Sequence, residues 1–479
     1  MTLLENFVNG AFVRGTADSP LALSNPSDRD DLIGSVPEGS PDDVRAAVTS
    51  ARAAFDAWRT LPGPARAEHL YRWASAVDDE RESLAQALAR EVGKPIGEAR
   101  GEIARCGVIL RYYAGEAVRA VGEVVPAQAV KTLQFTLRDP LGVCALITPW
   151  NFPAAIPLWK AAPALAFGNT VVLKPAERAS QTAVLLARTA VTAGLPPGVF
   201  NVVLGFGNTV GTALLEAADV RAVSFTGSTG VGAKVAAACA ARNIRFQTEM
   251  GGKNVAIVLP DADLDLAARL TAAGAMRYAG QKCTATSRVV VQESVAGALL
   301  DRLTAEVRKL PLGPVTDAAS AVGPLISMDA RDRVTTALAA VEGRVVHGGT
   351  VPAVAPFARG NFVEPAIVAD VAPDSPLAQD ELFGPVLAAF TARDLGEAIA
   401  IANRTRYGLS ASLFTRDLGA AMEYIRHIEA GLVRVNGDTT GVDPHAPFGG
   451  VKASSSGSRE QGSAARDFYT EIRTVQVSA

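Results

Sequence analysis

The residue with the clearest capacity for chemistry is Cys283, in the sequence Gly280-Gln-Lys-Cys-Thr-Ala-Thr-Ser-Arg288. Residues 270–278 before it have the spacing of a helix, and residues 288–292 after it are a β-branched run typical of a strand. A cysteine between such elements lies on a loop that the scaffold holds in place, where catalytic residues concentrate. The pattern therefore predicts a nucleophilic thiol.

A nucleophilic Cys283 needs a setting that favours the thiolate, because a free thiol is only a few per cent ionised at neutral pH. Lys282, Arg288 and nearby backbone N–H groups are the candidates for that setting. The alternative is a buried structural cysteine. The rest of the chain has to decide between the two.

Glu249 is the candidate general base, since it lies just before the turn Gly251-Gly252, where the backbone leaves room for water beside a carboxylate. A solvated turn residue is the plainer interpretation. Glu249 also follows Gly227 by 22 positions, which is close to the spacing of a ribose-binding acid in a standard dinucleotide fingerprint. We favour the general base.

The elements that would position these residues alternate between strand and helix after Pro140. Unbroken β-branched runs separated by helical segments are typical of a parallel sheet covered on both faces. The sequence predicts an α/β fold with strands at 143–147, 170–173, 199–204 and 222–225, and helices near 157–166 and 180–193.

Ligands of parallel sheets bind at the carboxyl ends of the strands. Lys174 and Glu177 follow one strand, and Thr226-Gly-Ser-Thr-Gly-Val-Gly232 follows another and opens a helix. Glycines at a helix N-terminus allow close approach to a phosphate, so the outline is that of a dinucleotide site. The order GxxGxG is not the standard fingerprint, and a simple helix cap or an exposed Lys-Glu ion pair would also account for these residues.

The first 140 residues predict helices followed by an extended pair. One helix begins at Ser40-Pro41 and runs to about Trp58, and two more cover 64–92 and 96–118. Residues 122–138 then alternate apolar and polar, as do residues 469–477 at the end of the chain. We expect both to project as strands that make an oligomer contact.

Composition excludes several functional classes. With 479 residues, the chain is expected to form two or three domains. A net charge of −3 without a basic run indicates neither nucleic-acid nor membrane binding. The four cysteines are far apart and only four histidines are present, so neither a disulfide framework nor a metal site is expected. A cytoplasmic location fits these features.

Seven motifs in order along the chain resemble the aldehyde dehydrogenase superfamily, and the resemblance covers essentially the whole sequence. They are Pro149-Trp-Asn-Phe-Pro153, Lys174-Pro-Ala-Glu177, Phe225-Thr-Gly-Ser228, Glu249-Met-Gly-Gly-Lys253, Gly280-Gln-Lys-Cys283, Glu381-Leu-Phe-Gly-Pro385 and Pro447-Phe-Gly-Gly450.

The resemblance implies a role for each matching residue. Cys283 would be the nucleophile and Glu249 the general base, with the Asn151 amide and the Cys283 backbone N–H as the oxyanion hole. Lys174 and Glu381 would hold ribose hydroxyls. The other cofactor contacts that it implies are Thr148, Trp150, Glu177, Gly207, Gly211, Phe225, Gly227, Ser228, Val231, Gly251 and, near the nicotinamide, Phe383.

The resemblance also implies an organisation. Residues 1–121 and 141–250 would form a Rossmann-like NAD(P)-binding domain, and residues 251–443 an α/β catalytic domain. Residues 122–140 and 444–479 would form a small β oligomerisation arm, and the protein would be a homodimer or homotetramer.

NAD is the expected cofactor, with NADP as an alternative. A Glu177 carboxylate near the adenosine ribose accepts hydrogen bonds from both hydroxyls but repels a 2′-phosphate. Lys174 can serve either cofactor. No metal is needed, because neither hydride transfer nor thioester hydrolysis calls for a Lewis acid.

Three stretches look most like those of bacterial 2-oxoglutarate (α-ketoglutarate) semialdehyde dehydrogenases: residues 156–163, 280–288 and 441–450. Such a substrate carries a distal carboxylate, and Arg277 is the candidate clamp for it, unless it is a surface arginine. Trp159 stands where an arginine is expected in succinate semialdehyde enzymes, which favours an aromatic or apolar tunnel instead.

Three rival functions differ in the fate or use of Cys283. An acylating enzyme would pass a thioester to coenzyme A, but Glu249 favours water. A cysteine hydrolase would need a histidine base, and none stands in a suitable motif. A binding protein without turnover would not need Cys283, Glu249 and Asn151 together.

Overall fold

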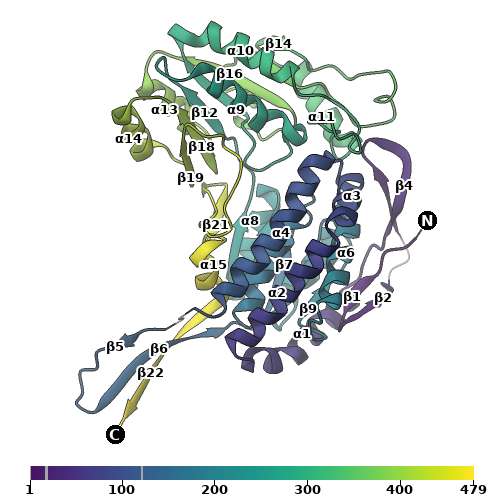
Figure 1. Ribbon diagram of the computed structural model, residues 1–479, viewed down its shortest axis with the longest axis vertical. Helices are drawn as coiled ribbons and strands as arrows, with labels where there is room; N and C mark the ends of the chain where they lie inside the picture. Colours follow the sequence, from purple (N-terminus) through teal and green to yellow (C-terminus); the bar gives the residue numbers. More distant parts are fainter. Residues whose placement is uncertain (1, 17–19, 120–121) are drawn as a thin grey trace.

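Two sheets organise the chain, and the computed structural model describes residues 2–16, 20–119 and 122–479 (Figure 1). The first sheet has a parallel centre flanked by antiparallel edges. Its spatial order is β2 (Ala11–Val13), β1 (Asn6–Val8), β9 (Phe200–Val202), β8 (Thr170–Lys174), β7 (Val143–Ile147), β10 (Val220–Thr226), β11 (Arg245–Glu249) and β21 (Ser455–Gly457).

The second sheet is built by the later part of the chain and is parallel except for one edge strand, β14. Its order is β14 (Arg344–His347), β15 (Ala366–Ala369), β16 (Val386–Ala392), β13 (Arg288–Gln292), β12 (Val255–Val258), β18 (Ser410–Phe414) and β19 (Leu432–Val435). Two parallel sheets confirm the predicted α/β fold class. Two short pairs complete the strands of the body: β3 (Leu21–Asn25) with β4 (Asp28–Val36), and β17 (Tyr407–Gly408) with β20 (Val451–Lys452).

The helices before the first parallel strand agree with the sequence in all but one respect. α1 (Pro41–Thr60) begins with the capping box that Ser40 and Asp43 form. The predicted helix 64–92 is two helices, α2 (Gly63–Asp79) and α3 (Arg81–Val92), because Glu80 leaves the helical conformation at ψ 13°. Neither Gly nor Pro marks that break. α4 (Ile96–Glu116) follows and lies beside α2 (Figure 1), and it also packs against α5 (Ala155–Ala166).

Each of the remaining helices lies between two strands in the sequence. Those of the first sheet are α6 (Ser180–Thr192), α7 (Thr212–Glu216) and α8 (Thr229–Ala241). Those of the later chain are α9 (Leu264–Met276), α10 (Ala296–Arg308), α11 (Met328–Ala339), α12 (Pro376–Gln379), α13 (Leu395–Asn403), α14 (Leu418–His427) and α15 (Gly462–Tyr469).

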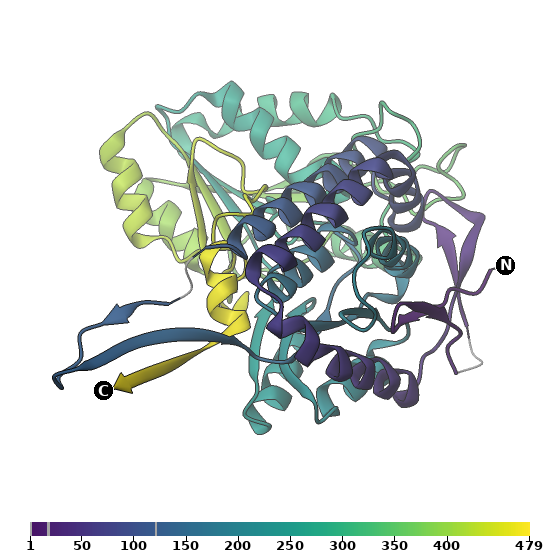
Figure 2. The same ribbon diagram turned by 60° about the horizontal axis from the view of Figure 1, so that its bottom comes forward.

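A three-stranded ribbon projects from the body (Figure 2). It consists of β22 (Thr470–Ser478), β6 (Thr132–Pro140) and β5 (Val124–Val125), so the two predicted extended segments pair with each other. Apolar side chains on it are exposed, among them Val124 at 77% and Ile472 at 58%. The predicted domain boundary at residue 121 lies outside the described residues. The other boundaries stay predictions, and β21 of the predicted arm segment pairs with β11 of the first sheet.

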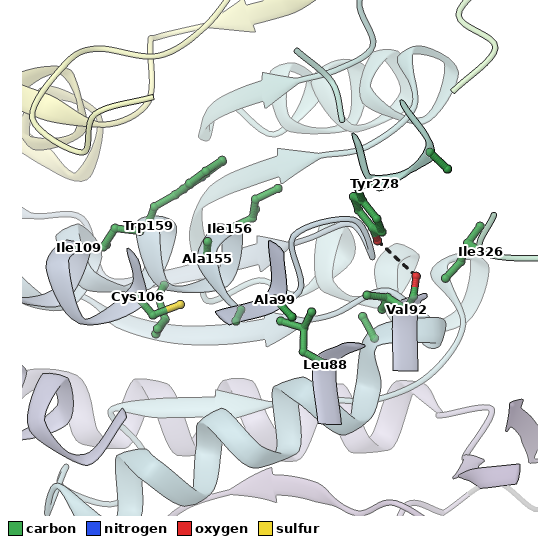
Figure 3. Packing of buried hydrophobic residues seen from close by; sticks show 14 of the residues in the cluster. Leu88, Val92, Ala99, Cys106, Ile109, Ala155, Ile156, Trp159, Tyr278 and Ile326 are labelled. Atoms are coloured by element: carbon green, nitrogen blue, oxygen red, sulfur yellow. Dashed lines mark hydrogen bonds between the residues drawn. The ribbon is translucent and has the colours of Figure 1, made fainter. Parts of the chain in front are cut away.

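A continuous apolar core links α4 and α5 to the later part of the chain. Figure 3 shows Cys106 and Ile109 of α4 beside Ala155, Ile156 and Trp159 of α5. The Tyr278 hydroxyl, farther along this core, donates a hydrogen bond of 3.3 Å to the Val92 carbonyl. Within residues 2–16, 20–119 and 122–479, we find no helix with the length and apolar character needed to span a membrane, and no group of three or more His, Cys, Asp or Glu placed to hold a metal ion.

Candidate active site

The Cys283 loop is held in a fixed shape between α9 and β13. The predicted helix 270–278 ends early, because Tyr278 and Ala279 have left-handed φ values of 55° and 52° inside the short 3-10 turn Arg277–Gly280. The Asn254 amide then donates to the carbonyls of Cys283 at 2.7 Å and Ala285 at 2.8 Å. These contacts fix the backbone on which the thiol stands.

The Cys283 thiol is protonated at neutral pH in this state. Burial, reinforced by the charges of Glu381 and Glu249, raises its pKa to about 12. The two cations that the sequence offered are engaged elsewhere: Lys282 pairs with Glu98 at 2.7 Å, and Arg288 donates to backbone carbonyls, one of them at 2.8 Å. Thiolate formation at Cys283 therefore depends on a proton acceptor rather than on a neighbouring cation.

Glu249 ends β11, and its carboxyl group is buried. One oxygen accepts a hydrogen bond of 2.7 Å from the Ser455 hydroxyl, while the other, Oε1, has no partner among the described residues. Burial and the charge of Glu460 raise the pKa of Glu249 well above its ordinary value. A carboxylate with a raised pKa and a free oxygen can accept a proton near neutral pH.

Asn151 approaches the Cys283 loop from the other sheet. It lies after β7, and its side-chain amide donates to the Gln281 carbonyl at 3.1 Å. The amide has two N–H groups, so one remains for another acceptor beside the thiol loop. Asn151 and Cys283 are thus brought together, as the sequence predicted.

A buried ion pair that the sequence analysis did not single out supports Asn151. Lys94 donates to the Asn151 carbonyl at 2.7 Å and pairs with Glu102 of α4. The second Glu102 oxygen accepts from the backbone N–H groups of Ala154 and Ala155, where α5 begins. Of the two residues, only Lys94 lies next to the end of a helix predicted from the sequence. No local pattern connects Lys94 with Asn151, which is 57 positions later.

The predicted cofactor residues at the end of β8 also lie together. Glu177 Oε1 accepts hydrogen bonds from the Lys174 ammonium at 3.1 Å and from the Gly207 N–H at 2.7 Å. Gly207 and Gly211 bound a single π-helical turn before α7. The ammonium and carboxylate are therefore held side by side over a glycine-rich backbone, an arrangement that suits a pair of hydroxyl groups.

Unpartnered hydroxyl groups lie where the parallel strands end. The buried Oγ1 atoms of Thr148, Thr226 and Thr229 have no hydrogen-bond partner among the described residues. Ser228 is the N-cap residue of α8 but makes no side-chain capping bond. Such groups, with the N–H groups that open a helix, are donors left for an anionic ligand.

The glycine-rich turn at α8 packs closely beneath this opening. A Cβ atom on Gly227 would lie 2.6 Å from the Phe225 ring, so the turn requires glycine. The Gly227 N–H donates to the Glu249 carbonyl at 3.0 Å, which joins the turn to β11, and Val231 is 48% exposed. The open donors and this close packing fit a dinucleotide phosphate at the α8 N-terminus.

The opposite wall comes from the later part of the chain. Glu381 Oε1 accepts from the Gly252 N–H at 3.0 Å, and burial raises the pKa of Glu381 to about 7. A Cβ on Gly251 would lie 2.1 Å from the other Glu381 oxygen. Phe383, with φ 54°, and Trp150 meet edge to face with ring centroids 5.5 Å apart. The two predicted aromatic residues thus come from different sheets.

A cavity of about 340 Å³ ends at Cys283. Trp159 lines it, and its indole N–H donates to Glu460 at 2.9 Å. Arg277 is exposed and is not among the lining residues, so the structure does not bring the predicted clamp into the cavity. The lining residues are Gly97, Glu98, Gly101, Glu102, Arg105, Phe152, Ala155, Trp159, Lys282, Cys283, Thr284, Thr440, Gly441, Val442 and Phe448.

Comparison with known families extends these observations over the whole chain. A family model described as the aldehyde dehydrogenase family matches residues 12–475. That range contains all the site residues described above and every strand of both sheets except β1 and the first residue of β2.

Several similar proteins are named as semialdehyde dehydrogenases. The chain is 44% identical to an alpha-ketoglutaric semialdehyde dehydrogenase of Bacillus subtilis, over 98% of this chain and 97% of that protein. It is 41% identical to an alpha-ketoglutarate semialdehyde dehydrogenase of Haloferax volcanii, over 98% of each. It is 38% identical to an NADP(+) succinate-semialdehyde dehydrogenase of Escherichia coli, over 97% of this chain and 96% of that protein.

Solved structures also match this chain over its full length. The crystal structure of an NAD-dependent aldehyde dehydrogenase from Sinorhizobium meliloti has a TM-score of 0.96 and 37% identity, and the match covers 100% of this chain and 95% of that one. The fold described above is therefore shared across the full length.

Proposed function

This chain belongs to the aldehyde dehydrogenase family, and we propose from that premise that it oxidises an aldehyde with a distal carboxylate, such as 2-oxoglutarate semialdehyde, to the acid with NAD. The observation that carries the proposal is a cavity that ends at Cys283, whose loop the Asn151 amide contacts and whose pKa the Glu249 charge raises.

The first step needs the Cys283 proton to leave. Glu249 is one of three carboxyl groups whose charge reaches this thiol, and its own raised pKa suits it to accept the proton. The thiolate sulfur then attacks the aldehyde carbon, and the carbonyl oxygen becomes the anion of a thiohemiacetal.

Two donors stabilise that oxyanion. We expect the Asn151 N–H that does not bond Gln281 and the Cys283 backbone N–H to donate hydrogen bonds to it. Losing one donor of this kind costs roughly 3–4 kcal/mol of transition-state stabilisation.

The residues that would hold the dinucleotide are Lys174, Glu177, Ser228, Glu381 and Phe383. When bound, the nicotinamide accepts the hydride that leaves the thiohemiacetal carbon, and a thioester remains on Cys283. Glu249 must first release to solvent the proton that it took from Cys283. It then takes a proton from a water molecule, whose oxygen attacks the thioester carbonyl, and returns that proton to the departing sulfur, so that the carboxylic acid and the thiol are released. One water is consumed for each aldehyde oxidised.

We propose NAD rather than NADP because the Glu177 carboxylate, which lies beside the Lys174 ammonium at the end of β8, would adjoin the adenosine ribose. Glu177→Ser should lower the ratio of kcat/KM for NAD to kcat/KM for NADP by about one order of magnitude, since a charge that repels the 2′-phosphate is removed. Steady-state rates with each cofactor measure this ratio. An unchanged ratio contradicts the assignment, and Glu177→Gln, which keeps the shape without the charge, should behave like the serine variant.

The pH dependence of turnover should follow the hydrogen bond between Ser455 and Glu249. That bond stabilises the carboxylate, so Ser455→Ala raises the pKa of Glu249 further. Because the base must be unprotonated, the acidic limb of kcat should move to higher pH by about one unit. A limb that stays or moves to lower pH contradicts the role. Ser456→Ala on the same strand is the control, since its hydroxyl bonds Thr248 instead.

The overall function is tested by reduced-nicotinamide formation with NAD or NADP and a panel of aldehydes. Succinate semialdehyde and 2-oxoglutarate semialdehyde represent the carboxylated class, and benzaldehyde and butanal the neutral class. A preference for the carboxylated aldehydes supports the proposal. A preference for the neutral ones would assign the Trp159 cavity to aromatic or aliphatic substrates. Acyl-CoA as the product with added coenzyme A would replace hydrolysis by acyl transfer.

Self-association and a reducing location complete the proposal. The exposed apolar residues of the ribbon and the free outer edge of β22 favour pairing with another copy, as a homodimer or homotetramer. The thiols of Cys106, Cys144, Cys239 and Cys283 are all free, which supports the cytoplasm as the compartment.

A further inference from the structure

The side of the substrate cavity that α4 forms has free space next to two glycines. Gly97 and Gly101 lie one turn apart on the helix face that lines the cavity, and a Cβ on either would meet nothing within 4 Å. Glycine inside a helix lowers its stability by roughly 1 kcal/mol relative to alanine. Two glycines on one face of α4 therefore destabilise the helix and leave room in the cavity. One further turn along the same face stands Arg105, which is half-buried.

Charges around the cavity leave Arg105 without a counter-ion. Glu98 is neutralised by Lys282 at 2.7 Å, and Glu102 by the buried Lys94. Among the residues that the structure describes, Arg105 makes no salt bridge or side-chain hydrogen bond. The exposed Asp443, on the loop after Val442, acts on it through space, as does the buried Cys106.

A half-buried guanidinium without a partner is costly, because burial disfavours the cation. Burial indeed lowers the pKa of Arg105 from its ordinary value. A carboxylate bound in two-point fashion would recover the lost hydration and use the planar set of donors. The other hydrogen-bonding side chains of the wall are less free, since the Lys282 ammonium is paired and the Trp159 indole N–H bonds Glu460.

We infer that Arg105 binds the distal carboxylate of the substrate between α4 and the loop 440–443, and that Asp443 is a competing anion at this subsite. The inference rests on the proposed function, and it names the residue that selects a carboxylated aldehyde. It assigns to Arg105 the task that the sequence had suggested for Arg277.

The kinetic test compares succinate semialdehyde with butanal, which has the same number of carbons but no charge. Arg105→Gln should lower kcat/KM for succinate semialdehyde about 10- to 100-fold more than for butanal, the range expected for losing hydrogen bonds to a charged group. Arg105→Lys should recover part of the difference. Equal losses for both aldehydes would mean a structural role and would overturn the inference.

Two other arginines serve as comparisons. Arg111→Gln changes an exposed residue of the same helix that pairs with Asp78 outside the cavity, and it should leave the ratio of the two kcat/KM values unaltered. Arg277→Gln should alter the ratio less than Arg105→Gln, because Arg277 does not line the cavity. If Arg277→Gln carries the larger change, the carboxylate subsite belongs to Arg277 and the inference fails.

A second readout needs neither cofactor nor turnover, so it stays informative if the protein fails to oxidise aldehydes. Glutarate should protect Cys283 from alkylation by iodoacetamide, followed by mass spectrometry of the intact protein. Arg105→Gln should raise the glutarate concentration for half-protection about 10- to 100-fold, with a smaller effect for the neutral glutaramide. Equal changes for both compounds, or none, would overturn the inference.

Asp443 offers a variant that leaves Arg105 in place. Asp443→Asn removes the competing charge, so it should lower the half-protecting glutarate concentration about two- to fivefold, with little change for glutaramide. A weaker protection by glutarate in this variant would contradict the position assigned to the carboxylate.

Discussion

Replacing Cys283 with alanine is expected to abolish aldehyde oxidation, with a loss of at least about 10⁴-fold in kcat. The carbon that is oxidised stays bonded to this sulfur from the attack on the aldehyde to the release of the acid, and no other described cysteine lines the cavity. Rates of reduced-nicotinamide formation at saturating aldehyde and cofactor measure the loss. Because the side chain is small and partly exposed, the thermal unfolding midpoint should change little.

The matched control is Cys239→Ala in α8. Cys239 is also a free thiol whose pKa burial raises, to about 11, but it belongs to a separate apolar cluster and not to the cavity. Its substitution should cost stability without a comparable loss of kcat. Residual oxidation by the Cys283 variant near the wild-type rate, or an equal loss in the control, would remove Cys283 from the chemistry.

Glu249→Gln is expected to separate the two halves of the reaction. If its main duty is to deprotonate water, the variant should lower steady-state turnover about 10²- to 10⁴-fold. The thioester on Cys283 should then accumulate, so a rapid burst of reduced nicotinamide of about one equivalent per site should precede the slow phase. Stopped-flow absorbance records the burst, and mass spectrometry of the quenched protein identifies the acyl group.

The outcome also distinguishes the two duties proposed for Glu249. A variant that loses the burst together with turnover would place its essential duty at thiol activation rather than at hydrolysis. Normal turnover would exclude both duties. Glu216→Gln, an exposed carboxylate of α7, controls for the change of net charge.

The sequence predicted the parts of the fold that local pattern determines. Strands β7 and β13 have the predicted bounds, because uninterrupted β-branched runs flanked by turn residues specify a buried parallel strand. The break between α2 and α3 at Glu80 was missed, since it is imposed by packing rather than by Gly or Pro. The early end of α9 was missed for a similar reason: two non-glycine residues adopt left-handed conformations that only the surrounding structure stabilises.

The same division applies to the candidate site. Motif order placed Cys283, Glu249 and Asn151 in one region. In the structure Cys283 lines the cavity, Asn151 contacts the Cys283 loop, and the charge of Glu249 acts on the thiol. Arg105 and the pair Lys94–Glu102 were not singled out, because their significance lies in contacts between segments far apart in sequence. Arg277 was suggested by its spacing from Cys283, but the turn at Tyr278 leaves it exposed.

The reacting groups lie on the two sides of the junction between the two sheets. Asn151 follows a strand of one sheet, Gln281 and Cys283 precede a strand of the other, and one 3.1 Å hydrogen bond between residues 130 positions apart joins them. A displacement of about 1 Å at such a junction costs on the order of 100-fold in rate. Mild heat or low urea should therefore inactivate the enzyme before any helix or strand melts.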